Sequence, residues 1–227
     1  MTVNSPYYGA RPLDSLHLEW ADCQRCYINR YRQSPIVGSG KHDADIVFVF
    51  DRPDVNLMFG GALSIDHPQM FTLEELLDEF GVAIKDQWIT TTTMCPTADP
   101  HEDRPFPLET MPAVKSECWT SCRPRLLQEV HLVQPELVVA CGANALKALY
   151  SKGKPPGYDE NLGRIVEVEI PGTISYPVPT LITYSMLQLY RTEEAFDPNN
   201  TWPSAREHIE LALRLVMTMK EYRGNNG

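Results

Sequence analysis

The sequence predicts an α/β fold, namely a three-layer α/β/α sandwich with a mostly parallel central sheet. Two apolar runs, Ile46–Phe50 and 137–140, lack polar alternation, as is typical of strands that are buried on both faces. Segments of helical periodicity separate the candidate strands, and strands that alternate with helices form parallel sheets covered on both sides. The chain has 227 residues, of which 43% are hydrophobic, so we expect a single domain over residues 1–227.

The first half of the chain contains two expected helices and two expected strands. A helix at 13–30 carries the first two cysteines, and the apolar run at 46–50 is the first strand. A helix at 71–80 has Thr72 as its N-cap and Gly81 after its end. The β-branched run at 88–93 is the second strand.

The second half of the chain continues the alternation. Pro203 stands at the first turn of a long amphipathic helix. Ligands of such sheets bind beyond the carboxyl ends of the strands, so we expect the site in the segments after residues 50, 93 and 183. The expected elements are helices at 113–133, 143–150 and 202–222 and strands at 137–140, 165–170 and Val178–Thr183.

The charge balance excludes a generic basic nucleic-acid binder. Lys and Arg total 20 against 30 Asp and Glu, which gives a formal net charge of −10. An enzyme that meets DNA through a local basic face remains compatible with this balance. Two stretches without acidic residues, 23–42 and 142–158, supply such a face. The basic residues expected to contact DNA are Lys152, Lys154 and Arg191, with Arg25, Arg30, Arg32, Lys41, Arg123, Arg125 and Lys147 as further contributors.

Two absences from the sequence bear on where the protein works. There is no run of roughly eighteen apolar residues, and the N-terminal segment lacks the apolar region of a signal peptide. We therefore expect a cytoplasmic protein with no membrane association and with reduced cysteines. No obligate protein partner is evident, and we expect a monomer.

Five of the six cysteines suggest a thiolate site. Cys23 and Cys26 form a CxxC pair, Cys95 follows the second strand, and Cys118 and Cys122 share one face of a helix. Cys23, Cys26, Cys118 and Cys122 fit a structural zinc site. Cys23, Cys26, Cys95 and one of the helical pair fit an iron–sulfur cluster instead, and the spacing does not choose between the two.

Several motifs occur in a defined order along the chain. The CxxC pair and Arg30 precede the turn Val37-Gly38-Ser39-Gly40 and the first apolar strand. A threonine-rich strand then leads to Cys95, Cys122 precedes Pro135, and Gly142-Ala143-Asn144-Ala145 follows the third strand. This order resembles the prokaryotic iron–sulfur (family 4) uracil-DNA glycosylases. The resemblance implies a three-layer α/β/α fold and a [4Fe-4S] cluster on Cys23, Cys26, Cys95 and Cys122, with Cys118 as a spare thiol.

The sequence departs from this family in the base pocket. The family's histidine–proline pair after the last strand is replaced by Ser185 and Met186, whereas the arginine that follows is kept as Arg191. The asparagine that pairs with the uracil edge is replaced by Thr91, and the glycine before the acidic residue by Phe50. The aromatic residue that stacks on the base falls at Ser64 or Ile65. The resemblance therefore implies a base pocket formed by Phe50, Ser64, Ile65, Thr91 and Tyr184.

The chemistry of base excision needs a carboxylate and a hydrogen-bond donor. Its transition state resembles an oxocarbenium ion, so a carboxylate orients water or balances positive charge, and a donor stabilises the departing base. Asp51, directly after the first strand, is the expected carboxylate; alternatively it caps a turn with Pro53 and Asp54. Ser185 is the expected donor, with Tyr184 and Thr91 as alternatives. His67 is expected to be a loop histidine, and His17, His42, His101, His131 and His208 have no constellation around them.

These residues indicate a monofunctional DNA glycosylase. Small residues in the loop that would close over the base (Gly60, Gly61, Ala62 and Ser64) enlarge the pocket and favour a bulky modified pyrimidine. Such bases occur in phage DNA, so defence against phages is one hypothesis for its role. The alternatives are a catalytically inactive, cluster-bearing scaffold that binds DNA or protein, an ordinary uracil-DNA glycosylase, and a metal-bound α/β protein unrelated to DNA.

Overall fold

The computed structural model describes residues 12–30, 35–51, 68–95, 116–150, 155–169, 177–186, 188–189 and 202–226. Six strands form one sheet in the order β1-β3-β2-β4-β6-β5. The strands are β1 (Ser39–Gly40), β2 (Ile46–Phe50), β3 (Trp88–Thr91), β4 (Leu137–Cys141), β5 (Ile165–Val168) and β6 (Val178–Thr183).

The four central strands are parallel, and the two edge strands are antiparallel to their neighbours. All residues of β2 and β4 are buried, as the unbroken apolar runs predict. The registers bring Phe50 opposite Thr91 and Cys141, and Cys141 opposite Thr183. The carboxyl ends of β3, β2, β4 and β6 therefore lie at one edge of the sheet.

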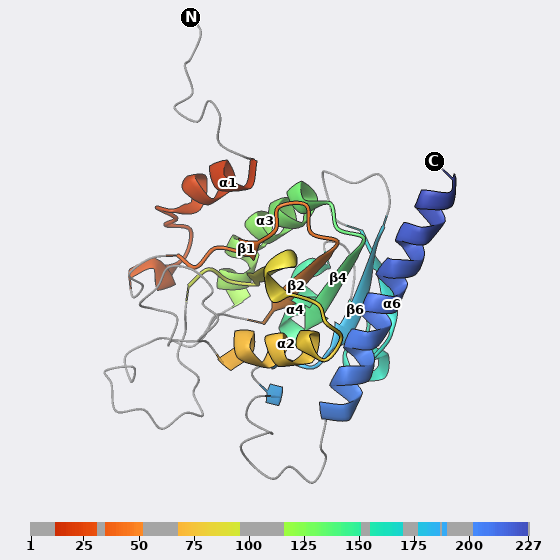
Figure 1. The fold of residues 1–227 in the computed structure, drawn as a ribbon. Helices are drawn as coiled ribbons and strands as arrows, with labels where there is room; N and C mark the ends of the chain where they lie inside the picture. The colour runs from red at the N-terminus through yellow and green to blue at the C-terminus, as the bar shows by residue number, and fades with distance from the viewer. Residues whose placement is uncertain are drawn as a thin grey trace, which may run out of the picture.

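Helices cover both faces of this sheet (Figure 1). Phe48 and Phe50 pack with α2 (Pro68–Asp78) and α6 (Trp202–Asn226) on one face. Val47 and Val49 pack on the other face with α1 (Pro12–Trp20), α3 (Ser116–Val133) and α4 (Ala143–Leu149). Alternate side chains of one strand point to opposite faces, so a single strand contributes to both cores. The predicted α/β/α sandwich is confirmed.

The first predicted helix is wrong in its extent. Helix α1 ends at Trp20, and the chain turns there through the bonds from the Ala21 and Cys23 amides to the Leu18 and Trp20 carbonyls. Cys23 and Cys26 thus lie in a turn before the short 3-10 helix η1 (Tyr27–Arg30), not on a helix.

Other boundaries shift by a few residues. Helix α2 begins at Pro68, so Thr72 is a fully buried residue inside the helix and not its N-cap. Gly81 follows α2 as predicted, with a φ of 68° that favours glycine. Strand β3 ends at Thr91, and α6 extends beyond Tyr222 to Asn226. Two further 3-10 helices are η3 (Ile84–Asp86) and η5 (Asp159–Asn161).

Within the described ranges, none of the helices combines the length and the apolar character needed to cross a membrane.

Candidate active site

Four of the expected site residues lie at the carboxyl edge of the sheet. Asp51 directly follows β2, Thr91 is the last residue of β3, and Tyr184 and Ser185 directly follow β6. The strand registers place these three strand ends level with one another. Ser64, Ile65, His67, Lys152, Lys154 and Arg191 lie outside the described residues.

Asp51 is held against the start of α4. Its Oδ1 accepts a hydrogen bond of 2.8 Å from the backbone amide of Ala145. Gly142, which precedes α4, has a φ of 106°, and a Cβ on it would stand 2.5 Å from Asp51 Oδ2. Glycine at 142 therefore makes room for the carboxylate, and Asp51 supplies the helix cap that Gly142 lacks. The expected alternative partners, Pro53 and Asp54, lie outside the described residues.

The ends of β2 and β3 are joined by threonines. The Thr92 hydroxyl donates to the Asp51 carbonyl, and the Thr92 amide donates to the Phe50 carbonyl over 3.0 Å. The Thr91 hydroxyl donates to the Thr93 carbonyl over 2.6 Å. A hydroxyl has one hydrogen to donate, so the Thr91 oxygen is left as an acceptor only. Phe50 itself is 1% exposed and belongs to the core.

His208 of α6 reaches this edge of the sheet. Its Nδ1 lies 3.0 Å from Thr183 Oγ1, and its ring stacks on Tyr184 at 5.6 Å between centroids and 9° between planes. Burial lowers the pKa of His208, although Glu207 opposes the change, so the imidazole is neutral at neutral pH. The prediction that no functional residues surround His208 is wrong, because Thr183 and Tyr184 contact its ring. Helical spacing from the core residues Ala205 and Ala212 is the signal that places it on the inner face of α6.

Tyr158 is a second residue of this edge that the sequence analysis missed. Its hydroxyl donates to the Thr183 carbonyl over 3.0 Å, and the same carbonyl accepts the Gly142 amide at 3.0 Å. Burial raises the pKa of Tyr158, and the negative charge of Asp51 raises it further. Tyr158 therefore stays a neutral donor near Asp51. Ser185 is half-buried, and its hydroxyl has no hydrogen-bond partner among the described residues.

The thiols gather between the N-terminal turn, the end of β3 and α3. Cys95 and Cys118 pack with Ile28, and Cys26 packs against them. Burial raises the pKa of Cys122; Arg125 and a hydrogen bond with the Met94 backbone oppose this, and the nearby Cys26 and Cys23 thiols add to it. Cys122 is therefore close to both members of the CxxC pair. Across the ranges that the structure covers, no three His, Cys, Asp or Glu side chains are grouped as ligands of a single ion.

A buried ion pair links this thiol region to β3. Arg125 and Glu129 are both 0% exposed, and Arg125 Nη1 lies 2.8 Å from Glu129 Oε1 and 2.8 Å from Thr90 Oγ1. Arg125 Nη2 donates to the Thr91 carbonyl. The expectation that Arg125 contributes to DNA contact is therefore wrong, because its guanidinium is enclosed by α3 and β3.

Glu129 also joins α1 to this network. His17 Nε2 lies 3.2 Å from Glu129 Oε1, and the His17 ring stacks on Trp88. Burial works to raise the pKa of Glu129, but Arg125, with His17 and Thr90, lowers it to about 2. A Cβ on Gly38 would lie 2.8 Å from the Trp88 ring and 2.9 Å from Glu129 Oε2, which explains a glycine there. His17 therefore contacts both Glu129 and Trp88, whereas the sequence analysis expected no functional residues around it.

The comparison with known proteins decides the family. The family model of the uracil DNA glycosylase superfamily matches residues 37–203, which is more than half of the chain. The chain belongs to the uracil-DNA glycosylase superfamily. The matched range holds the whole sheet, Asp51, Tyr184, Cys95 and Cys122, whereas Cys23, Cys26 and His208 lie outside it.

Curated relatives of this superfamily member are named type-4 uracil-DNA glycosylases. The relative from Sulfurisphaera tokodaii is 23% identical over 214 residues, covering 92% of this chain and 87% of its own length. The relative from Thermotoga maritima is 30% identical over 124 residues, covering 55% of this chain and 58% of its own. The match to the Saccharolobus solfataricus protein is 22% identical and spans 62% of this chain and 60% of that protein.

Proposed function

We propose that the protein is a monofunctional DNA glycosylase that acts at the carboxyl edge of its sheet. The observation that carries the proposal is the fixed position of the Asp51 carboxylate, between Gly142 and the Ala145 amide, in a chain of the uracil-DNA glycosylase superfamily. A carboxylate held by the backbone keeps one orientation as a flipped nucleotide enters, which is what positioning catalysis requires.

In the proposed reaction the bond between the deoxyribose C1′ and the base nitrogen breaks. The electron pair leaves with the base, and the sugar gains oxocarbenium character that the Asp51 charge stabilises. The oxygen of a water molecule oriented by Asp51 bonds to C1′, and its proton passes to the carboxylate or to solvent. The products are the free base, protonated on its nitrogen, and an abasic site.

Residues at the end of β6 are proposed to assist the departing base. Ser185 is half-buried, and its hydroxyl is not engaged by any described side chain or carbonyl, so it can donate to the base. His208 acts through Tyr184, because the stacked rings fix the wall of the pocket beside Ser185. We assign His208 as a positioning residue.

The proposed substrate is a bulky modified pyrimidine. The Thr91 hydroxyl is committed as a donor to the Thr93 carbonyl, so it cannot give the paired donor and acceptor contacts of a carboxamide to uracil. Loss of such paired contacts relaxes discrimination at the base edge. We propose a 5-substituted pyrimidine, of the kind found in phage DNA, and a role in defence against phages. Contacts to DNA are proposed for Lys152, Lys154 and Arg191, and also for Lys147, which is exposed.

The substrate is tested by an abasic-site assay on a panel of duplexes. The panel contains uracil, 5-hydroxymethyl pyrimidines and glucosylated cytosine, and alkali-labile breaks are counted. We expect breaks on at least one modified duplex and fewer on the uracil duplex. Breaks on uracil alone would mean that the protein is an ordinary uracil-DNA glycosylase. DNA binding without breaks on any duplex would favour the inactive scaffold, which the serine at position 185 suggests.

We further propose that Cys23, Cys26, Cys95 and Cys122 hold a [4Fe-4S] cluster. The donor set fits, because the structure brings Cys122 beside the CxxC thiols and Cys95 beside Cys26. The cluster, when bound, would tie the N-terminal turn to α3. Thiolates bind it, so its formation removes the protons that burial retains on Cys122.

Cys122→Ser is expected to abolish the cluster, whereas Cys118→Ser is expected to keep it. Both thiols are buried on α3, at 3% and 1% exposure, so the pair is a matched control. Iron and sulfide content and absorbance near 400 nm would be measured after anaerobic purification. The reverse pattern, with iron lost only from Cys118→Ser, would reassign the fourth ligand, and zinc in place of iron would refute the cluster.

A further inference from the structure

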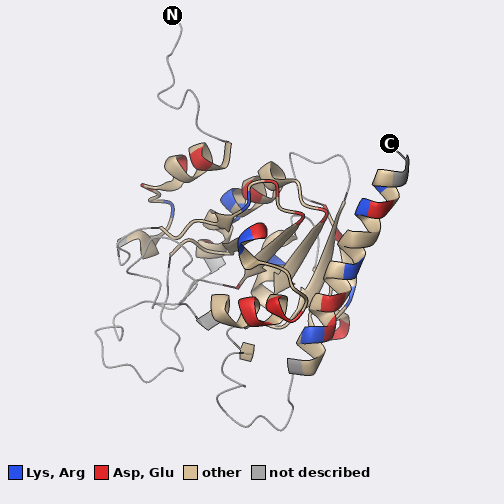
Figure 2. Cartoon of the chain, viewed as in Figure 1, with Lys and Arg blue, Asp and Glu red and all other residues tan. Residues whose placement is uncertain are grey.

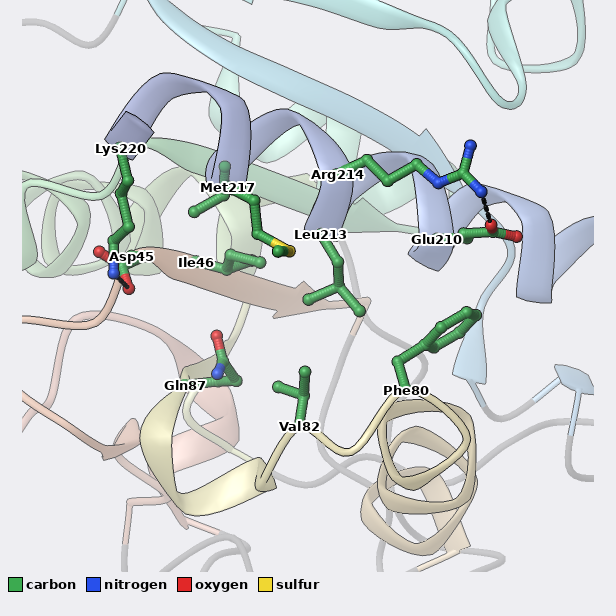
Figure 3. Close-up of a pocket in the computed structure, with 11 residues that line it drawn as sticks. Asp45, Ile46, Phe80, Val82, Gln87, Glu210, Leu213, Arg214, Met217 and Lys220 are labelled. Atoms are coloured by element: carbon green, nitrogen blue, oxygen red, sulfur yellow. Dashed lines mark hydrogen bonds and ion pairs between the residues drawn. The ribbon is translucent and has the colours of Figure 1, made fainter. Parts of the chain in front are cut away.

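A groove lies at the amino-terminal end of the parallel strands, whereas Asp51 lies at their carboxyl end. It has a volume of about 320 Å³ and is lined by β2, α6 and the segment from α2 to β3 (Figure 3). Its floor is Ile46, the first residue of β2, whereas Asp51 follows the last residue of that strand. Five residues of strand separate the two by about 17 Å, so the groove is not part of the proposed active site.

The walls of the groove are apolar and recessed. Ile46 and Val216 are 2% and 6% exposed, and Val82 and Leu213 are partly buried. Met217, which is 61% exposed, stands at the mouth. Of the lining residues that the structure describes, Met217 is the one apolar side chain that is mainly exposed. The apolar surface is thus reached by entering the groove and is not spread over an open face.

Gln87 places a carboxamide inside this apolar groove. The residue is 7% exposed, and Figure 3 shows its amide pointing into the space beside Val82 and below Ile46. Its backbone is fixed, because its amide donates to the Ile84 carbonyl and its carbonyl accepts from the Lys41 amide. The side chain makes no hydrogen bond with any residue that the structure describes. This carboxamide offers two donors and an acceptor that a bound molecule can meet in place of water.

The charged residues of the rim are already paired. Lys220 Nζ lies 2.5 Å from Asp45 Oδ2 at one end, and Arg214 is paired with Glu210 at the other. Two acidic and two basic residues line the groove, so their formal charges cancel. A charged ligand would have to break one of these pairs, whereas a neutral ligand would not.

We propose that this groove binds a small neutral molecule that is mostly apolar and carries an amide or imide edge. The apolar walls bury its body, and Gln87 exchanges a donor and an acceptor with its polar edge. The volume lies at the lower end of the range for small-molecule sites, roughly 300–1,000 Å³. A protein partner fits less well, because a stable interface buries about 1,200 Å² or more and the apolar walls are recessed.

The probe for this proposal is benzamide, an aromatic ring with a neutral carboxamide. It would be titrated into the full-length protein while the methyl signals of Ile46, Val82, Leu213 and Met217 are followed by NMR. We expect saturable shifts of these signals with benzamide, and weaker binding of toluene and benzoate, which lack the amide or carry a charge. Gln87→Leu is expected to weaken benzamide about tenfold, as loss of a paired hydrogen bond does, and to leave toluene unchanged.

Two variants of exposed α6 residues complete the test. Met217→Trp should block benzamide, whereas Leu211→Trp, at an exposed position outside the groove, should not. If Gln87→Leu does not fold, the comparison of Met217→Trp with Leu211→Trp still tests whether benzamide binds in the groove. Equal binding of benzamide and toluene, or no effect of Gln87→Leu or Met217→Trp, would overturn the proposal. So would concentration-dependent self-association that Met217→Trp abolishes, since the occupant would then be a second copy. Base excision is not used as a readout, so failure here is separate from failure of the proposed function.

Discussion

Asp51→Asn is expected to lower the single-turnover rate of base release by about 10²–10⁴-fold. Asparagine keeps an oxygen that accepts the Ala145 amide, so the contact to α4 survives. The negative charge that would face the sugar is lost, and with it the stabilisation of the oxocarbenium-like transition state. Rates would be measured with enzyme in excess over the best duplex of the panel, and DNA binding by fluorescence anisotropy.

Asp45→Asn is the matched control for this variant. Asp45 precedes β2 and pairs with Lys220, so the same charge is removed at the other end of the same strand. Its rate should stay within about twofold of the unmodified protein, because an exposed ion pair contributes about 1 kcal/mol or less to stability. A rate for Asp51→Asn within that same range would remove Asp51 from the mechanism.

Arg125→Met is expected to lower the free energy of unfolding by about 3–5 kcal/mol. The substitution keeps much of the side-chain volume but leaves the Glu129 carboxylate buried without its main partner. It also removes the donor to Thr90 Oγ1 and the Thr91 carbonyl, which hold the end of β3 beside Asp51. Urea unfolding followed by circular dichroism measures the change. The Arg125→Met/Glu129→Leu double variant should regain much of the loss, and a double variant as unstable as the single would contradict the ion-pair account.

The same pair makes stability depend on pH in a defined direction. The pKa of Glu129 is lowered to about 2 in the folded chain, below its ordinary value of 4.5. The contribution of Glu129 to the free energy of unfolding is therefore fully present above about pH 4.5. It is lost as the pH falls toward 2, because the carboxylate is then protonated in the folded chain as well. The shift corresponds to about 3 kcal/mol, and Arg125→Met should lose this part of the acid dependence. Unchanged acid sensitivity in the variant would show that other carboxyl groups dominate.

The pattern of apolar residues along the sequence predicted the strands that are buried on both faces. The runs that became β2 and β4 are apolar at every position, and only a strand between two helical layers buries all of them. Strand β1, Ser39–Gly40, is too short to carry a pattern. The end of α1 was missed because the following residues continue a plausible helix, and the turn is fixed by contacts with α3 and with Met94, which follows β3.

The site could be predicted only where strand ends define it. Asp51 and Tyr184 follow from the rule that parallel strands share a carboxyl edge, whereas Thr91 was expected from the family resemblance. His208 and Tyr158 come from segments whose docking the sequence does not reveal, and their partners are backbone and side-chain groups of Thr183. Arg125 and Glu129 form an i, i+4 pair that resembles a solvated helix face, and only the packing of α1 and β3 shows that it is buried.

The charge distribution bears on how DNA reaches this edge. Figure 2 shows Asp and Glu along α2, with acidic and basic residues mixed along α6. Phosphate groups are repelled from α2, so the backbone of the duplex is expected to lie toward α4 and the N-terminal turn, where Lys147 and Arg25 are exposed.

The most direct test of the central claim is a single-turnover measurement of free base. The purified protein, with Asp51→Asn as the blank, would be incubated in excess with each duplex of the panel, and the released base would be identified by mass spectrometry. We predict one free modified pyrimidine per abasic site, absent from the blank. Intact DNA on every duplex, with binding retained, would contradict the claim that this edge of the sheet is a glycosylase active site.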